Sequence, residues 1–299
     1  MEGSGGIREV EKVVTAHKQR EGGGFIVRRP FPGLGMPAVD PFLLLDEMGP
    51  IDYPPGEAVG APDHPHRGFE TVTYVLEGEM EHEDSAGHRG SLRPGDVQWM
   101  TAGAGIIHAE MPSRALREHG GRVHGFQIWV NLPARLKLTT PRYQELPAAS
   151  IPTAETPDGR ARVRIVAGEA LGVRAAIDTH TPIIYQDWSV APDGDVTVGV
   201  ARDHQALVYV FEGGVLVGDR GGGREVTDGQ MALLGAGDSV RLRGPAGGGR
   251  LLLLAGVPLG EPIARYGPFV MNNDAELVAA FQDYQSGRMG EITRTAKVG

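Results

Sequence analysis

Short apolar runs separated by turn residues recur along the whole chain. Between residues 70 and 78, Val72, Tyr74 and Leu76 fall on one side of an extended chain, and the residues between them fall on the other. Comparable runs, rich in β-branched and aromatic residues, lie at 25–29, 42–48, 96–100 and 125–132. No helical period persists through this part of the chain. The pattern predicts an all-β sandwich or barrel.

This pattern of runs occurs twice. Residues 70–80 resemble residues 206–216, and residues 90–100 resemble residues 227–242 around a Gly-Asp step. We therefore expect two copies of one β-barrel. The first copy has a His-X-His sequence before its repeated strand, whereas the second has a single histidine there, His204.

The repeat and the composition of the intervening stretches predict the division of the chain. The expected segments are, in order, an N-terminal arm (1–24), a first barrel (25–133), a connector rich in Pro, Ala and Thr (134–160), and a second barrel without metal ligands (161–299). The arm is either loose or an edge strand. The second barrel ends in a helix that Asn273 or Asp274 caps and that places Leu277 and Ala280 on one apolar stripe.

Composition and charge exclude several classes of function. The 299 residues carry a formal net charge of −9, so a basic footprint is missing and direct nucleic-acid binding is not expected. The lack of cysteine excludes disulfides and thiolate metal sites. The sequence has no apolar stretch long enough to span a membrane and no signal-peptide pattern. We therefore expect a cytoplasmic protein, either a monomer or a weak dimer.

Two pairs of potential metal ligands lie on predicted strands. His64 and His66 form one pair, and His108 and Glu110 form the other. In an extended segment, residues two apart point to the same side. One such pair could arise by chance among 10 histidines, but two pairs that flank a predicted hairpin are harder to explain that way. Three nitrogens and one carboxylate suit a single divalent transition metal: Fe, Ni, Co, Mn, Cu or Zn.

Other polar residues near these pairs have weaker claims to a function. Glu70 is an alternative ligand or a partner that orients an imidazole. Arg67 could pair with a carboxylate or orient an anion. His82 and His88 flank an acidic turn, and we expect them to face solvent or to form hydrogen bonds within that loop.

Several long segments resemble the pirin family, a group within the bicupins. They are DPFLLLDEMGP (40–50), DHPHRGFETVTYVLEG (63–78), PGDVQWMTAGAGIIHAEMP (94–112), FQIWVNLP (126–133) and LLLLAGVPLGEPIARYGPFVMN (251–272). The resemblance is loosest in the connector and in the middle of the second barrel. One departure is Ala104, because many pirins have a basic residue in that turn. The electrostatics of a relative's pocket therefore do not carry over directly.

The resemblance implies two tandem cupin barrels of the jelly-roll type, a short C-terminal helix, and a metal in the first barrel. The family's ligands fall on His64, His66, His108 and Glu110, which favours Glu110 over Glu70 as the carboxylate. Some family members are quercetin 2,3-dioxygenases, and the animal members are nuclear iron-binding co-regulators of transcription. Fold alone does not choose between these roles.

We expect a metal-dependent dioxygenase, with Fe(II) as the first choice of metal, that cleaves a flavonol-like enolic aromatic substrate with O₂. Glu110 would be both a ligand and the base that takes the substrate's 3-hydroxyl proton. Trp99, Phe126 and Ile128 are candidates for the pocket wall. Two alternatives stay open: a non-enzymatic metal-binding module that binds a protein partner according to its metal state, and an isomerase or hydrolase that needs no oxygen.

Overall fold

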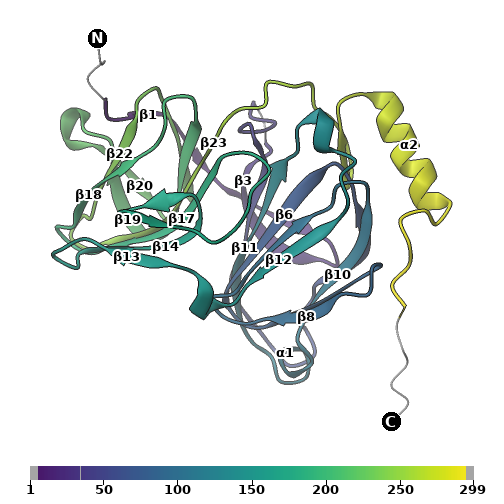
Figure 1. Ribbon diagram of the computed structural model, residues 1–299. Helices are drawn as coiled ribbons and strands as arrows, with labels where there is room; N and C mark the ends of the chain where they lie inside the picture. The colour runs from purple at the N-terminus through teal and green to yellow at the C-terminus, as the bar shows by residue number, and fades with distance from the viewer. Residues whose placement is uncertain (1–5, 34, 294–299) are drawn as a thin grey trace. The chain divides into compact units, whose positions relative to one another are not determined.

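The computed structural model describes residues 6–33 and 35–293 of the chain. The chain forms two compact units, each assembled from separate stretches of sequence. Unit 1 comprises Met1–His17, Gly33–Pro41 and Ala149–Pro258, and unit 2 comprises Lys18–Pro32, Phe42–Ala148 and Leu259–Gly299. Both units consist mainly of antiparallel strands, which confirms the predicted all-β class with two barrels and a short C-terminal helix (Figure 1).

Among the described residues, unit 2 contains two large sheets and one two-stranded hairpin. The larger sheet has seven strands in the order β12 (Arg142–Leu146), β9 (Val97–Thr101), β6 (Phe69–Glu77), β11 (Gly121–Asn131), β4 (Phe42–Tyr53), β3 (Phe25–Phe31) and β2 (His17–Glu21). The smaller sheet has four strands in the order β5 (Ala61–His66), β10 (Ile106–Pro112), β7 (Met80–Asp84) and β8 (Arg89–Leu92). The two predicted ligand pairs therefore lie on neighbouring strands of the smaller sheet.

The alternation of side chains along β6 and β11 decides which residues face the interior of unit 2. Thr73 and Val75 of β6 line the interior cavity, as do Gln127 and Trp129 of β11. Phe126 and Ile128 are buried, but they do not line the cavity, because neighbours along a strand point to opposite faces. Trp99 is also buried away from it. The expectation that these three residues wall the pocket was wrong.

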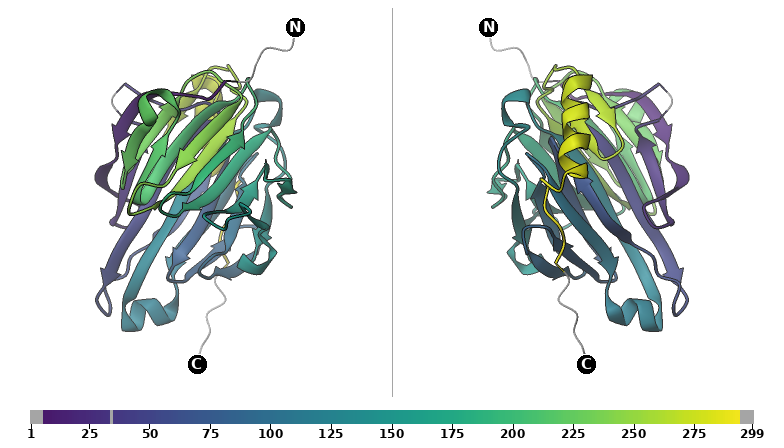
Figure 2. Two further views of the ribbon diagram at one scale, coloured as in Figure 1. Left: turned by 90° about the vertical axis from the view of Figure 1, so that its left-hand side faces the viewer. Right: turned by 90° about the vertical axis from the view of Figure 1, so that its right-hand side faces the viewer.

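The C-terminal segment returns to unit 2 after unit 1 is complete. It forms the hairpin β24 (Ala264–Tyr266) and β25 (Phe269–Met271), followed by α2 (Asp274–Gln285). Asn273 caps α2 by accepting a hydrogen bond from the backbone of Glu276, and Leu277 is buried beneath the helix. The right-hand view of Figure 2 shows α2 in yellow over the strands of unit 2. This helix groups with unit 2, whereas it was expected to end the second barrel.

Unit 1 is formed by a sheet of ten strands among the described residues. Their order is β1 (Val10–Thr15), β21 (Gln230–Leu234), β19 (Gln205–Val217), β23 (Gly249–Gly256), β17 (Ile183–Val190), β14 (Ala161–Ala167) and β13 (Thr153–Glu155), with β18 (Asp195–Gly199), β20 (Arg224–Thr227) and β22 (Ser239–Arg243) attached through β19. Strand β1 pairs with β21, so Val10–Thr15 of the predicted N-terminal arm form an edge strand. Apolar side chains from these strands fill the interior.

A few short elements complete the fold. They are α1 (Arg114–His119), the β15 (Glu169–Ala170) and β16 (Val173–Arg174) hairpin, and the 3₁₀ turns at Ala134–Leu136, Ala148–Ser150 and Arg220–Gly222. The expected connector is therefore largely structured, since β12 joins the large sheet of unit 2 and β13 joins unit 1. None of the helices in the described residues is long and apolar enough to cross a membrane.

Candidate metal centre

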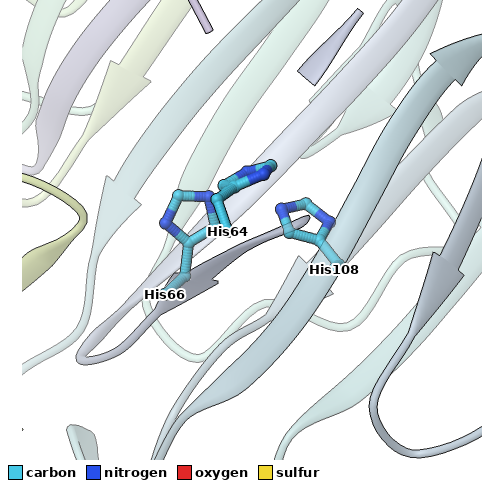
Figure 3. Close-up of side chains that lie close together, drawn as sticks. All are labelled: His64, His66 and His108. Carbon is cyan, nitrogen blue, oxygen red and sulfur yellow. The ribbon is translucent and has the colours of Figure 1, made fainter. Parts of the chain in front are cut away.

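Three of the four predicted ligands meet on one face of the smaller sheet. Strands β5 and β10 run antiparallel and place His64 directly opposite His108. His66 lies two residues further along β5 and so points to the same side as His64. The three residues each offer a ring nitrogen, and these nitrogens all lie within 4.8 Å of one another (Figure 3). Sequence spacing and strand register together produce this cluster.

Backbone carbonyls hold the rings of His64 and His66 in one tautomer. Nδ1 of His64 donates to the carbonyl oxygen of Pro62 at 2.7 Å, and Nδ1 of His66 donates to that of Pro268 at 3.3 Å. A carbonyl can only accept, so the proton of each neutral ring is on Nδ1. The Nε2 lone pair of each ring is therefore available to a metal, which is the arrangement that histidine ligands usually have.

His108 differs from the other two histidines in its lack of hydrogen bonds. It is 2 % exposed, and neither of its ring nitrogens has a hydrogen-bond partner among the described residues. Burial lowers its pKa well below the ordinary value, and the neighbouring His64 and His66 act in the same direction. His108 is therefore a neutral imidazole. A buried, unpartnered nitrogen is costly, and a metal ion at the cluster would satisfy it.

Glu110 lies beside this cluster but is not one of the three residues that form it. It follows His108 on β10 across an irregularity in the pairing with β5, where Glu110 pairs with Ala61. Its Oε1 accepts a hydrogen bond from the hydroxyl of Thr73 at 2.7 Å. Glu110 lines the same cavity as His64 and His66. The structure thus places this carboxylate in the site region and gives it a neutral partner.

The other candidates from the sequence have structural partners. Glu70 is buried and accepts a hydrogen bond from Thr101 at 2.6 Å. Arg67 forms an ion pair with Asp283 of α2 at 2.8 Å. Glu70 does not belong to the cluster of three histidines. These contacts are sufficient to explain both residues.

Of the two alternatives expected for His82, exposure to solvent was wrong: the residue is buried and forms hydrogen bonds, but on a strand rather than in a loop. The acidic stretch forms strand β7 rather than a turn, and β7 pairs with β10 so that His82 lies opposite Glu110. Gln98 and Glu145 contact Nε2 of His82 at 2.7 Å and 3.0 Å. His88, in contrast, is exposed, as expected.

A cavity of about 630 Å³ opens from the histidine cluster within unit 2. That size is typical of sites for small organic ligands. Much of the lining is apolar, and Trp129 packs edge-on against His66 with 5.2 Å between ring centroids. Its charged lining residues are two arginines, Arg29 and Arg265, and five carboxylates: Glu21, Asp46, Asp63, Glu77 and Glu110. The cavity therefore combines an apolar wall with a few charged groups.

The β24–β25 hairpin contributes part of this lining, a contribution that was not expected from the sequence. Pro268 supplies the carbonyl that holds His66, and Arg265 lies 4.6 Å above the ring of Trp129. The close approach depends on Gly68, because a Cβ there would lie 2.0 Å from the carbonyl oxygen of Val270. The one signal in the sequence was that the family resemblance includes residues 251–272.

A duplicated β-barrel with a histidine cluster in one copy defines the class of two-domain cupins. Residues 24–130 match the Pirin family, and residues 185–290 match the Pirin C-terminal cupin domain. The chain therefore belongs to the pirin family, which confirms the resemblance found in the sequence.

Individual relatives agree with this membership over nearly the whole chain. The chain is 42% identical to a pirin-like protein of Solanum lycopersicum, over 95% of this chain and 93% of the relative. It is 40% identical to pirin of Homo sapiens, over 96% of this chain and 95% of the relative. The structure is similar to that of a quercetin 2,3-dioxygenase from Acinetobacter baumannii, with a TM-score of 0.88 and 38% identity over 96% of this chain and 100% of that one.

Proposed function

We propose that this protein binds one divalent transition metal and cleaves a flavonol-like enolic aromatic substrate with O₂. The metal ligands are His64, His66, His108 and Glu110, with Fe(II) as the first choice and Ni, Co, Mn, Cu or Zn compatible with the same donors. The observation that carries the proposal is the buried His108: its two nitrogens lack partners in the described part of the chain, and it lies next to two histidines with available Nε2 atoms.

Two observations favour this reaction class over other uses of a metal. The similar structure from Acinetobacter baumannii is named as a quercetin 2,3-dioxygenase. The cavity beside the histidines is large enough for a planar aromatic molecule and has an apolar wall. Bound there, the metal would supply Lewis-acid and redox chemistry towards O₂.

The protein's own groups have separate tasks in this proposal. Glu110 takes the proton of the substrate's hydroxyl group, since one of its oxygens is held by Thr73 and the other is available. The carbonyl oxygens of Pro62 and Pro268 keep two imidazoles oriented through the reaction. Trp129 and the apolar wall exclude water and support the aromatic rings of the substrate.

The test is to incubate the purified protein with quercetin in air. Turnover is measured as the loss of flavonol absorbance and as oxygen uptake. We expect turnover with at least one of the metals, and loss of turnover in His108→Ala and Glu110→Gln. The matched control is His88→Ala, which removes an exposed histidine on the same unit and retains activity. No turnover with Fe, Ni, Co, Mn or Cu would contradict the enzyme and favour the metal-dependent binding module instead.

A further inference from the structure

The two arginines that line the cavity differ in their partners. Arg29 is fully paired: its Nε lies 2.6 Å from Oδ1 of Asp46, and its Nη1 lies 2.7 Å from Oε1 of Glu21. Arg265 has no carboxylate of the described residues within ion-pair distance. Its one hydrogen bond runs from Nη1 to the carbonyl oxygen of Leu43 at 3.3 Å. A guanidinium without a direct ion pair thus faces the cavity, although the negative charges of Asp46 and Glu21 act on it from a distance.

Stacking fixes the plane of the Arg265 guanidinium without using its N–H groups. The group lies 4.6 Å above the ring of Trp129, and Trp129 is itself packed against Phe69 at 4.3 Å and His66 at 5.2 Å between ring centroids. Nε and Nη2 have no hydrogen-bond partner among the described residues and are not sealed from the cavity. These two nitrogens form the edge that binds a carboxylate in a bidentate manner.

The charge of Arg265 is held partly out of water. Burial lowers its pKa from the ordinary value and the positive charge of Arg29 acts in the same direction, whereas the carboxylates of Asp46 and Glu21 oppose them in part. The group stays protonated at neutral pH, because an arginine is always charged there. A partly buried cation with two unused donors is costly unless an anion binds to it.

We propose that Arg265 binds a carboxylate on the ligand, so that among aromatic ligands of this cavity those that also carry a carboxylate bind more tightly than neutral molecules of the same size. The aromatic part of the ligand lies along the apolar wall, and its far end points towards the histidine cluster. This placement of the reacting end rests on the proposed function, whereas the binding of the carboxylate does not. Arg265 is thus a specificity-determining residue contributed by the C-terminal hairpin.

The experiment compares two probes, 2-naphthoate and 2-naphthol, which share a ring system and differ in charge at neutral pH. Binding to the protein as purified is measured by calorimetry. We expect the wild-type protein to bind 2-naphthoate about tenfold or more tightly than 2-naphthol, because a charge-assisted bidentate pair contributes at least that much. Arg265→Gln should remove this preference and leave the affinity for 2-naphthol unchanged.

Two further variants make the result specific. Arg265→Lys keeps the charge but loses the planar fork, so we expect an intermediate affinity for 2-naphthoate. Arg114→Gln removes an exposed arginine of α1 that pairs with Glu118, and it should behave as wild type. If Arg265→Gln fails to fold in a melting experiment, Arg265→Lys decides the question.

Equal affinity of wild type and a folded Arg265 variant for 2-naphthoate would overturn the proposal. That result includes the case in which the carboxylate binds to a metal at the histidines, because such binding does not involve Arg265. A wild-type protein without any preference for the acid would overturn it too. Neither outcome concerns the oxygenase reaction, since no turnover is measured, and failure of the quercetin assay leaves this binding result intact.

Discussion

The two units differ mainly in what points into their barrels. In unit 2, Thr73 and Val75 of β6 line a cavity, and in the matching strand of unit 1, Val208 and Val210 of β19 are packed in a closed apolar core. Strands β5 and β10 bring His64 and His108 face to face, whereas β18 and β22 bring Val198 and Val240 face to face. One strand pattern therefore supports either a filled core or a site, depending on a few inward-facing residues.

The largest expected effect comes from replacing His108 of unit 2 by valine, the residue type found at Val240 in unit 1. His108→Val should abolish metal binding, because it removes one of three clustered imidazoles. In metal-free protein the same change should raise stability by about 1–3 kcal/mol, since it removes two buried nitrogens without partners. Elemental analysis and denaturant unfolding measure the two effects. Wild-type metal content in His108→Val would contradict the proposed site, and His88→Ala is the control.

A second test concerns a buried lysine of unit 2 that connects three segments of the chain through hydrogen bonds. Nζ of Lys137 donates to the carbonyl oxygens of Gly68 and Val270 at 2.8 Å and 3.0 Å, and to Oδ1 of Asn131 at 2.7 Å. Lys137→Met should lower the free energy of unfolding by about 3 kcal/mol, because three buried acceptors lose their donor. Urea unfolding measures the change. A loss below about 1 kcal/mol would show that water replaces the ammonium group, and the exposed Lys18→Met serves as control.

Reciprocal exchanges on the repeated strands sharpen the comparison further. Val208→Thr places a hydroxyl group in the apolar core of unit 1 and should cost about 2 kcal/mol of stability. Thr73→Val removes a hydroxyl next to a cavity and should cost clearly less, although Glu110 loses its hydrogen bond. Thermal melting of both variants tests the difference. Equal losses would mean that the two barrel interiors are equally intolerant of the change.

The smallest expected effect is a pH dependence from the cavity wall. Burial raises the pKa of Asp46 from 3.8 to about 6, despite the opposing hydrogen bond from Arg29. The folded state therefore binds more protons than the unfolded state between these two values, and stability rises as the pH falls through 6. Relative to Asp46→Asn, the wild type should gain about 1 kcal/mol between pH 7 and pH 5. A difference that stays constant with pH would show that Asp46 remains ionised throughout.

The local pattern of the sequence was enough to predict the strands and the clustering of the three histidines. A period of two identifies β6, and the spacing of His64, His66 and His108 places all three rings on one face once β5 and β10 pair. The position of Glu110 could not be predicted, because an irregularity in that pairing follows His108. The face of β11 that points into the cavity could not be predicted either, because both faces of this strand are largely buried and apolar.

Contacts between distant segments were beyond the reach of the sequence. Arg265 and Pro268 lie about two hundred residues after the histidine pair of β5, and nothing in their neighbourhood indicates that they line the cavity. His82 was misassigned for a related reason, because an acidic stretch next to glycine is typical of a turn. Its burial depends on pairing with β10, which local composition does not encode.

The discontinuous build of unit 2 has a consequence for the order of events during synthesis. Pro268, which orients His66, and Arg265, which lines the cavity, leave the ribosome only after Ala149–Pro258 has been made. At ordinary rates of translation, that interval is on the order of ten seconds. A nascent chain therefore carries the histidine pair of β5 for some time before Pro268 can orient it, and an ion captured in that period meets an unfinished pocket.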